Sequence, residues 1–262
     1  MKKIYFGTNL KMYKTIRMTL EYLHYLEELT GDIGREGMEL FVIPSYTSLE
    51  RAVENTDRRL VRLGAQNMNW EDEGQFTGDI SPVMLKELGL DLVMIGHSER
   101  RHVFRETDAE ENQKVKAALR HGFTALLCIG ETAKDKAYGV SAEVLRTQIK
   151  IGFSGVGREE IHRLRVAYEP VWSIGVHGIP ATAEYAEKMH REIKKVLGEL
   201  FGRDGLEIPV LYGGSVNLGN ACQLIVQESI DGLYVGRAAW EASAFDRLIR
   251  ESMEAYGNQT TE

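Results

Sequence analysis

The sequence has few cysteines and no long apolar segment, and both absences narrow the class of protein. Only two cysteines, Cys128 and Cys222, occur in 262 residues, so the chain has neither a disulfide framework nor a zinc knuckle. No segment reaches membrane-spanning length, and the N-terminal residues include no apolar run as long as that of a signal peptide. We therefore expect a cytoplasmic protein that does not associate with membranes.

The sequence also has no excess of positively charged over negatively charged residues. Lys and Arg total 32 against 39 Asp and Glu, which gives a formal net charge of −7. A mildly acidic chain without a basic cluster is a poor candidate for binding nucleic acid. With 43% hydrophobic and 27% charged residues, the composition is that of a globular protein. Because no linker-like segment divides the chain, we expect one domain over residues 1–262.

Short apolar segments alternate with amphipathic segments along the chain. Most of the apolar segments are apolar throughout, as in strands buried on both faces of a parallel sheet. Strands are expected at residues 4–9, 40–44, 60–66, 92–96, 124–130, 164–169, 209–213 and 232–236. Helices are expected at residues 18–29, 112–120, 141–151, 183–201 and 245–256, with Thr182 capping the fourth of these. Residues 202–205 and 258–262 are expected to be loose.

Eight strand and helix units of this kind predict an α/β fold, a closed (β/α)₈ barrel, which typically takes about 250 residues. A doubly wound open sheet is the alternative. That fold usually carries a GxGxxG turn after its first strand, whereas here the first strand ends in the sequence TNLK. Because barrel enzymes carry their chemistry at the C-terminal ends of the strands, we look there for functional residues.

Polar side chains follow three of the predicted strands. Asn9 ends the first strand and Lys11 comes two residues later, His97 follows the fourth strand and Glu169 ends the sixth. Taken singly, a surface lysine, a core histidine or a salt-bridged glutamate would be an ordinary explanation. Glu169 is flanked by Tyr, Pro and Trp, and desolvation of a carboxylate suits a general base that works near neutral pH.

Glycine-rich turns follow the last two strands. Residues 212–217 read YGGSVN and residues 235–237 read VGR. Glycines let backbone N–H groups approach an anion closely, and barrel phosphate sites commonly lie in these two loops. Residues 173–180, after Glu169, form an apolar segment with two glycines, which we expect to be a lid that excludes water. These features predict a small phosphorylated substrate.

The sequence lacks the motifs of several other chemistries. It has no HExxH, CxxC or GxSxG and no metal-ligand cluster, so we expect no metal and no cofactor. The candidate residues at the strand ends can instead move a proton on the carbon next to a carbonyl group. Glu169 would be the base, His97 would polarise the oxygens and Lys11 would offset the negative charge. Two other classes stay open, a Schiff-base aldolase that uses Lys11 and a non-catalytic phosphosugar sensor.

The ordered motifs resemble those of the triosephosphate isomerase family from about Lys3 to the last helix. They are NxKM at 9–12, GAQNMNW at 64–70, FTGDISP at 76–82, IGHSERR at 95–101, CIGET at 128–132, AYEPVW at 167–172, YGGSVN at 212–217 and DGLYVG at 231–236. The resemblance implies a cofactor-free isomerase that works through an enediolate. Its three-carbon reaction, between dihydroxyacetone phosphate and glyceraldehyde 3-phosphate, belongs to glycolysis and gluconeogenesis.

The resemblance also implies a role for each site residue. The family's base, neutral-histidine electrophile and closing loop are well established, and they correspond to Glu169, His97 and residues 173–180. Lys11 would be the transition-state cation and Asn9 a substrate-oxygen contact, while Glu99 would order the surroundings of Lys11 and His97. Backbone N–H groups that would meet the phosphate lie near Gly175, Ser215, Gly236 and Arg237.

The family is usually a homodimer, and this resemblance implies a dimer here as well. One subunit's loop at residues 75–78 would enter its neighbour and support Asn9, Lys11 and His97. Thr77 is the residue we expect at that interface.

The sequence departs from the family pattern at the site. Leu10 and Tyr13 stand where most members have Trp and Asn, and the lid is one residue longer and lacks the usual lysine. Arg237 replaces a second glycine, and Trp240 follows it. The longer lid and the GRxxW sequence resemble a branch that converts L-erythrulose 1-phosphate to D-erythrulose 4-phosphate. That substrate carries one extra hydroxymethyl group, and both the three-carbon and the four-carbon substrate stay open.

Overall fold

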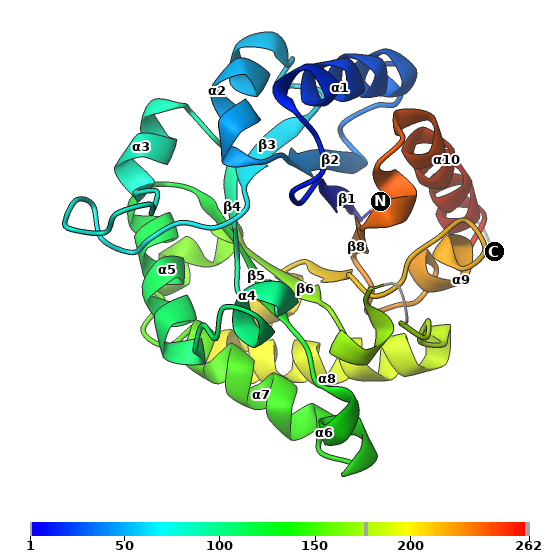
Figure 1. Ribbon diagram of the computed structural model, residues 1–262. Coiled ribbons are helices and arrows are strands. Elements are labelled where there is room, and N and C mark those ends of the chain that lie inside the picture. Colours follow the sequence, from blue (N-terminus) through cyan, green and yellow to red (C-terminus); the bar gives the residue numbers. More distant parts are fainter. Residues whose placement is uncertain (1, 176–177, 260–262) are drawn as a thin grey trace.

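Eight parallel strands close into a barrel in a computed structural model that describes residues 2–175 and 178–259 (Figure 1). The first strand, β1, pairs with β2 on one side and with β8 on the other. This closure excludes the open-sheet alternative. The strands are β1 Ile4–Asn9, β2 Met38–Ile43, β3 Arg62–Ala65, β4 Leu92–Ile95, β5 Thr124–Ile129, β6 Leu164–Tyr168, β7 Val210–Tyr212 and β8 Gly232–Val235.

Helices surround the barrel (Figure 1). They are α1 Ile16–Thr30, α2 Tyr46–Asn55, α3 Pro82–Glu87, α4 Ser98–His102, α5 Asp108–Arg120, α6 Ala133–Ala137, α7 Ser141–Gly152, α8 Ala183–Phe201, α9 Ala221–Ile225 and α10 Ala242–Gln259. Thr182 caps α8 as predicted, because its side chain accepts a hydrogen bond from the N–H of Tyr185. Over the described residues, no helix combines the length and the apolar character needed to cross a membrane.

The described residues of the two segments expected to be loose are ordered. Residues 202–205 belong to a 3₁₀ helix, Gly202–Glu207, which begins at a glycine with a φ of +69°. Gly205 lies so close to the backbone of Leu197 that a Cβ atom would not fit. The helix α10 continues to Gln259, so the predicted loose tail is helical at its first two residues. Residues 260–262, like Val176 and His177 of the expected lid, lie outside the described residues.

The apolar side chains form two clusters, one on each side of the strands. The outer cluster lies between the strands and the helices. The inner cluster fills the barrel and is formed by Phe41, Ile43, Leu92, Met94, Leu126, Cys128, Ala167, Leu211 and Tyr234. Burial on both faces explains why the strands are apolar throughout. Because the interior is packed, a substrate can bind only at the barrel's ends.

Candidate active site

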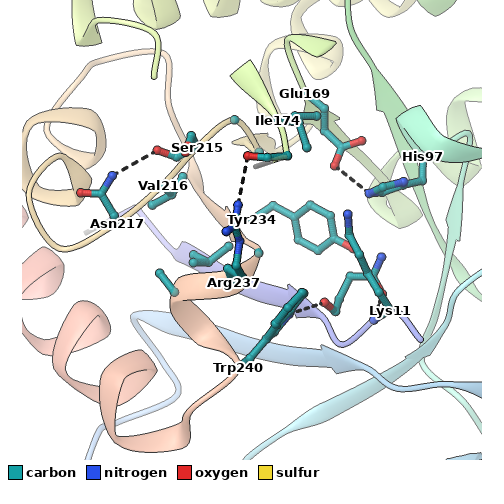
Figure 2. A pocket seen from close by; sticks show the side chains of 17 residues that line it. Lys11, His97, Glu169, Ile174, Ser215, Val216, Asn217, Tyr234, Arg237 and Trp240 are labelled. Atoms are coloured by element: carbon teal, nitrogen blue, oxygen red, sulfur yellow. Dashed lines mark hydrogen bonds and ion pairs between the residues drawn. The ribbon is translucent and has the colours of Figure 1, made fainter. Parts of the chain in front are cut away.

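A cavity of about 330 Å³ lies at the C-terminal ends of the strands (Figure 2). Its lining includes eight of the predicted site residues, Asn9, Lys11, His97, Glu169, Gly175, Ser215, Gly236 and Arg237. Two predicted residues lie elsewhere. Glu99 contacts Lys11 from outside the lining, and Thr77 lies in a segment, residues 71–79, that is exposed throughout.

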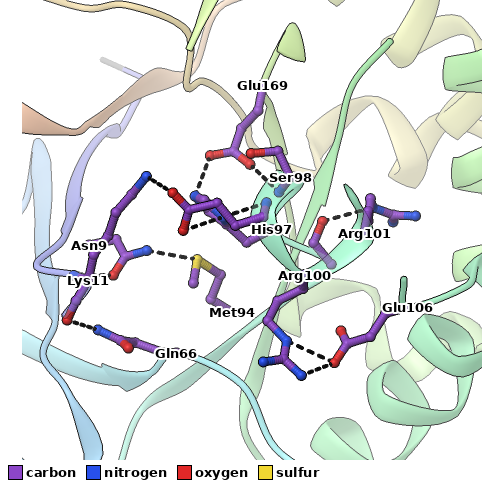
Figure 3. Close-up of polar contacts among 12 residues, drawn as sticks. Asn9, Lys11, Gln66, Met94, His97, Ser98, Arg100, Arg101, Glu106 and Glu169 are labelled. Atoms are coloured by element: carbon purple, nitrogen blue, oxygen red, sulfur yellow. Dashed lines mark hydrogen bonds and ion pairs between the residues drawn. The ribbon is translucent and has the colours of Figure 1, made fainter. Parts of the chain in front are cut away.

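His97 is the N-cap residue of α4, and this position fixes its tautomer. Its Nδ1 accepts a hydrogen bond from the backbone N–H of Glu99 at 3.1 Å. A nitrogen that accepts a bond carries no proton, so the ring is neutral and its proton is on Nε2. Gly96, with a φ of +71°, makes the turn that brings the histidine there. The Nε2 atom lies 3.4 Å from Oε1 of Glu169 (Figure 3).

Glu169 directly follows β6 and is only 4% exposed. Its Oε2 accepts a bond from the backbone N–H of Ser98 at 3.3 Å, so the carboxylate lies over the start of α4. A Cβ atom at Gly213 would come within 2.9 Å of the Glu169 Cγ, and glycine there leaves room for the glutamate. Burial and the nearby Glu169 charge raise the pKa of the Cys128 thiol, which is therefore not a nucleophile at neutral pH.

Lys11 has a strained backbone that its neighbours hold in place. Its φ is +51°, a conformation that is unfavourable for any residue other than glycine. Asn9 Oδ1 accepts a bond from the Lys11 N–H at 2.7 Å, and Gln66 Nε2 donates to the Lys11 carbonyl at 2.8 Å. Because residues in rare conformations persist only where the surroundings fix them, the position of the lysine is closely determined.

The Lys11 ammonium forms an ion pair with Glu99, with Nζ 2.6 Å from Oε1. Burial acts to raise the pKa of Glu99, but the hydrogen bond from Lys11 and the positive charge of Lys11 act against it, and that pKa is lowered. The ammonium is held by a carboxylate, whereas a Schiff-base nucleophile has to be a free amine that can attack a carbonyl. The ion pair therefore favours an electrostatic role for Lys11 over the aldolase alternative.

The opposite end of the cavity is suited to an anion. Gly175, Ser215 and Gly236 line it, and the Ser215 N–H donates to the Ser173 hydroxyl at 3.2 Å. Arg237 Nη2 donates to the Gly175 carbonyl at 3.0 Å, so this residue connects the loop after β8 to the start of the expected lid. Within the described part of the chain, the Arg237 guanidinium forms no ion pair. The sequence predicted a phosphate contact only for the backbone N–H groups near Arg237, and not for its guanidinium.

Two residues that depart from the family pattern, Tyr13 and Trp240, contact each other. The rings of Tyr13 and Trp240 lie 4.4 Å apart, centroid to centroid. Trp240 also lines the cavity and donates from Nε1 to the Asn9 carbonyl at 2.9 Å. These positions are far apart in the sequence, so their contact depends on the closure of the barrel and was not foreseen.

Sequence reasoning missed Glu131, although it lies within the CIGET motif. This fully buried carboxylate accepts bonds from Tyr168, from Trp172 Nε1 at 2.8 Å and from Tyr185 at 2.9 Å. Trp172 directly precedes the expected lid, and the Lys136 ammonium is 3.3 Å from the centre of its ring. The signal available in the sequence was an acidic residue directly after an apolar strand. In residues 2–175 and 178–259, no cluster of three potential metal ligands occurs.

The fold and the site together define a class of protein. A buried carboxylate faces a neutral imidazole beside a lysine, in a barrel whose last two loops suit an anion, and this arrangement is that of a barrel isomerase. The family model for triosephosphate isomerase matches residues 4–252, and the chain belongs to that family. It is an isomerase of the triosephosphate isomerase type that acts on a phosphorylated sugar, as the motifs predicted.

Known proteins with similar sequences and structures carry two names. L-erythrulose-1-phosphate isomerase of Rhizobium etli is 47% identical over 95% of this chain and 92% of its own length. The protein of that name from Rhizobium meliloti is 43% identical over 96% and 98%. Triosephosphate isomerase of Fusobacterium nucleatum is 41% identical over 95% and 99%. The crystal structure of triosephosphate isomerase from Bartonella henselae has a TM-score of 0.87 and 32% identity, with 96% and 99% coverage.

Proposed function

We propose that this protein interconverts L-erythrulose 1-phosphate and D-erythrulose 4-phosphate. The observation that carries the proposal is the position of Trp240, which departs from the common family pattern, lines the cavity and bonds to Asn9. The similarity to two proteins named for the four-carbon substrate supports it. Leu10, fully buried where most members have the larger tryptophan, is consistent with a reshaped site.

In the proposed reaction, Glu169 is the base. It takes the proton from the hydroxyl-bearing carbon next to the ketone and returns it to the former ketone carbon, while the two oxygens exchange a proton through the enediol. His97 donates from Nε2 to these oxygens, since its Nδ1 is occupied by the N–H of Glu99. Neutral histidine at a helix N-terminus beside a glutamate base is known from triosephosphate isomerase itself. Lys11 offsets the negative charge of the enediolate, Asn9 contacts a substrate oxygen, and Glu99 orients Lys11.

The phosphate is proposed to bind at the end formed by Gly175, Ser215, Gly236 and Arg237. The Ser215 N–H, which donates to the Ser173 hydroxyl, would exchange that partner for a phosphate oxygen. The Arg237 guanidinium supplies a positive charge that no carboxylate within the described residues neutralises by an ion pair. A lid that closes over this end would exclude water from the enediolate.

We also propose a cytoplasmic homodimer with one barrel domain per chain. The segment at residues 71–79, drawn in cyan before α3 in Figure 1, projects from the barrel and is exposed throughout. It contains Thr77 and Phe76, whose aromatic side chain is 45% exposed. Met12, next to Lys11, is 94% exposed. Large apolar side chains left in solvent beside a site are typical of a surface that a partner covers.

The test of the substrate is the ratio of two kcat/KM values for the wild-type protein. L-erythrulose 1-phosphate and glyceraldehyde 3-phosphate are assayed side by side. A difference of one methylene-sized group changes specificity by about 10- to 200-fold, so activity on both is expected, with the four-carbon substrate preferred. A preference of more than about a thousandfold for glyceraldehyde 3-phosphate would contradict the proposal, because it exceeds what such a group decides.

A further inference from the structure

Tyr234 lines the cavity and has no role in the proposed chemistry. It lies on β8, and its side chain points into the barrel, where its ring stacks on Phe41 at a centroid distance of 5.9 Å. Its hydroxyl lies 2.8 Å from the sulfur of Met94, on β4. Because β4 and β8 are on opposite sides of an eight-stranded barrel, the side chain extends across the barrel (Figure 2).

The contact of the Tyr234 hydroxyl with Met94 directs it toward the side of the site where Asn9 and His97 lie. Met94, its contact, precedes His97 by three residues on the same strand and loop. The side-chain nitrogen of Asn9 lies 3.8 Å from the same sulfur (Figure 3). The phenol therefore ends below Asn9 and His97, which we place around the substrate oxygens.

The hydroxyl is available for a stronger partner than the one it has. Burial raises the pKa of Tyr234 well above its usual value, so the group is a neutral O–H donor at physiological pH. A thioether sulfur is a weak acceptor. Rotation of the hydroxyl hydrogen can redirect the bond to a substrate oxygen without moving the ring. Among the described residues, the sulfur of Met94 is the only hydrogen-bond partner of this buried donor, which is thus suited to the recognition of an alcohol.

We propose that the Tyr234 hydroxyl recognises the terminal hydroxymethyl group that the four-carbon ketose phosphate has and the three-carbon substrate lacks. This inference rests on the proposed function. A phosphate bound near Ser215 and Gly236 places the other end of the substrate beyond the reacting carbons. The remaining polar side chains there, Asn9, Lys11, His97 and Glu169, already serve the enediolate.

The experiment compares Tyr234→Phe with wild type on both substrates. Phenylalanine keeps the ring and its stacking on Phe41 and removes only the hydroxyl. Leaving a buried polar group without its partner lowers kcat/KM for L-erythrulose 1-phosphate by about 5- to 150-fold. The value for glyceraldehyde 3-phosphate stays within about twofold, which also shows that the variant is folded. Tyr5→Phe is the matched control, since Tyr5 packs against the same inner cluster and is absent from the cavity lining.

Three results would overturn the inference. One is a loss smaller than about threefold on the four-carbon substrate, and another is an equal loss on both substrates. The third is a Met94→Leu variant that changes the substrate preference as much as Tyr234→Phe does. The phenol would then act through Met94 and Asn9 and not on the substrate. Wild-type protein that fails to turn over L-erythrulose 1-phosphate would instead refute the proposed function. The wild-type protein is therefore assayed on this substrate before the variants.

Discussion

Glu111 gives the protein a pH-dependent stability that one substitution should remove. This glutamate of α5 is fully buried, and neither carboxylate oxygen has a hydrogen-bond partner among the described residues. Burial raises its pKa from 4.5 to about 7, although the charges of Arg101 and Lys114 oppose the rise and Glu106 adds to it. At 1.36 kcal/mol per unit, this rise corresponds to about 3 kcal/mol that disfavours the ionised form in the folded protein.

The sign of the effect follows from proton linkage. The folded protein binds the Glu111 proton more tightly than the unfolded chain does, so this group's contribution to stability is complete below pH 4.5. It is lost as the pH rises through about 7. Glutamine has the same shape and no charge. Glu111→Gln should therefore be more stable than wild type at pH 8.5, by up to about 3 kcal/mol, and close to it near pH 4.5.

The assay is thermal and urea unfolding of both proteins at fixed protein concentration, since association would shift the apparent stability. A gain of about 3 kcal/mol corresponds to a rise in Tm of about 6–12 °C for a chain of roughly this size. Glu50→Gln is the matched control, because Glu50 is an exposed glutamate on α2. A variant that is less stable than wild type at pH 8.5, or a gain that is the same at both pH values, would refute the reasoning.

Four further predictions concern the site and the interface. Glu169→Gln should lower kcat by about 10²–10⁴ or more with little effect on KM, and retention of half the wild-type turnover would exclude Glu169 as the base. Lys11→Met should weaken binding and turnover, Lys11→Arg should not restore them fully, and a borohydride adduct on Lys11 would contradict its electrostatic role. Phe76→Glu combined with Thr77→Glu should give a protein that is monomeric by light scattering and has low activity. Wild-type protein that is monomeric at micromolar concentration would exclude the dimer. Arg237→Gln should raise the inhibition constant of inorganic phosphate about tenfold, consistent with the loss of a charged hydrogen bond, and an unchanged constant would remove the guanidinium from the phosphate site.

The boundaries of the elements differ from the prediction where polar groups compete for the backbone. The helix α5 begins at Asp108, four residues before the predicted start, because Thr107 and Glu110 form a capping box ahead of the first apolar residues. The strand β3 begins at Arg62 and not at residue 60. The N–H groups of Leu60 and Val61 bond to the Asp57 carbonyl in a turn, and apolar character alone does not reveal this.

The sequence by itself determined the barrel and the strand ends at which the candidate catalytic residues lie. Strands that are apolar throughout and separated by amphipathic helices have to be buried on both faces, and eight of them close on themselves. A polar residue directly after such a strand is carried to the same end of the barrel as the others. The grouping of Lys11, His97 and Glu169 is thus a consequence of local pattern and topology.

Only the tertiary structure decided how these residues are held. The bond from Trp240 to Asn9 joins positions 231 residues apart, and the contact of Tyr234 with Met94 spans 140. Both require the barrel to close with a particular register, since a shift of one residue turns every strand side chain to the other face. Similarly, the network around Glu131 draws on three separate elements. Periodicity reports which face of an element is buried, but the partner that each side chain meets across the barrel depends on the packing of the whole chain.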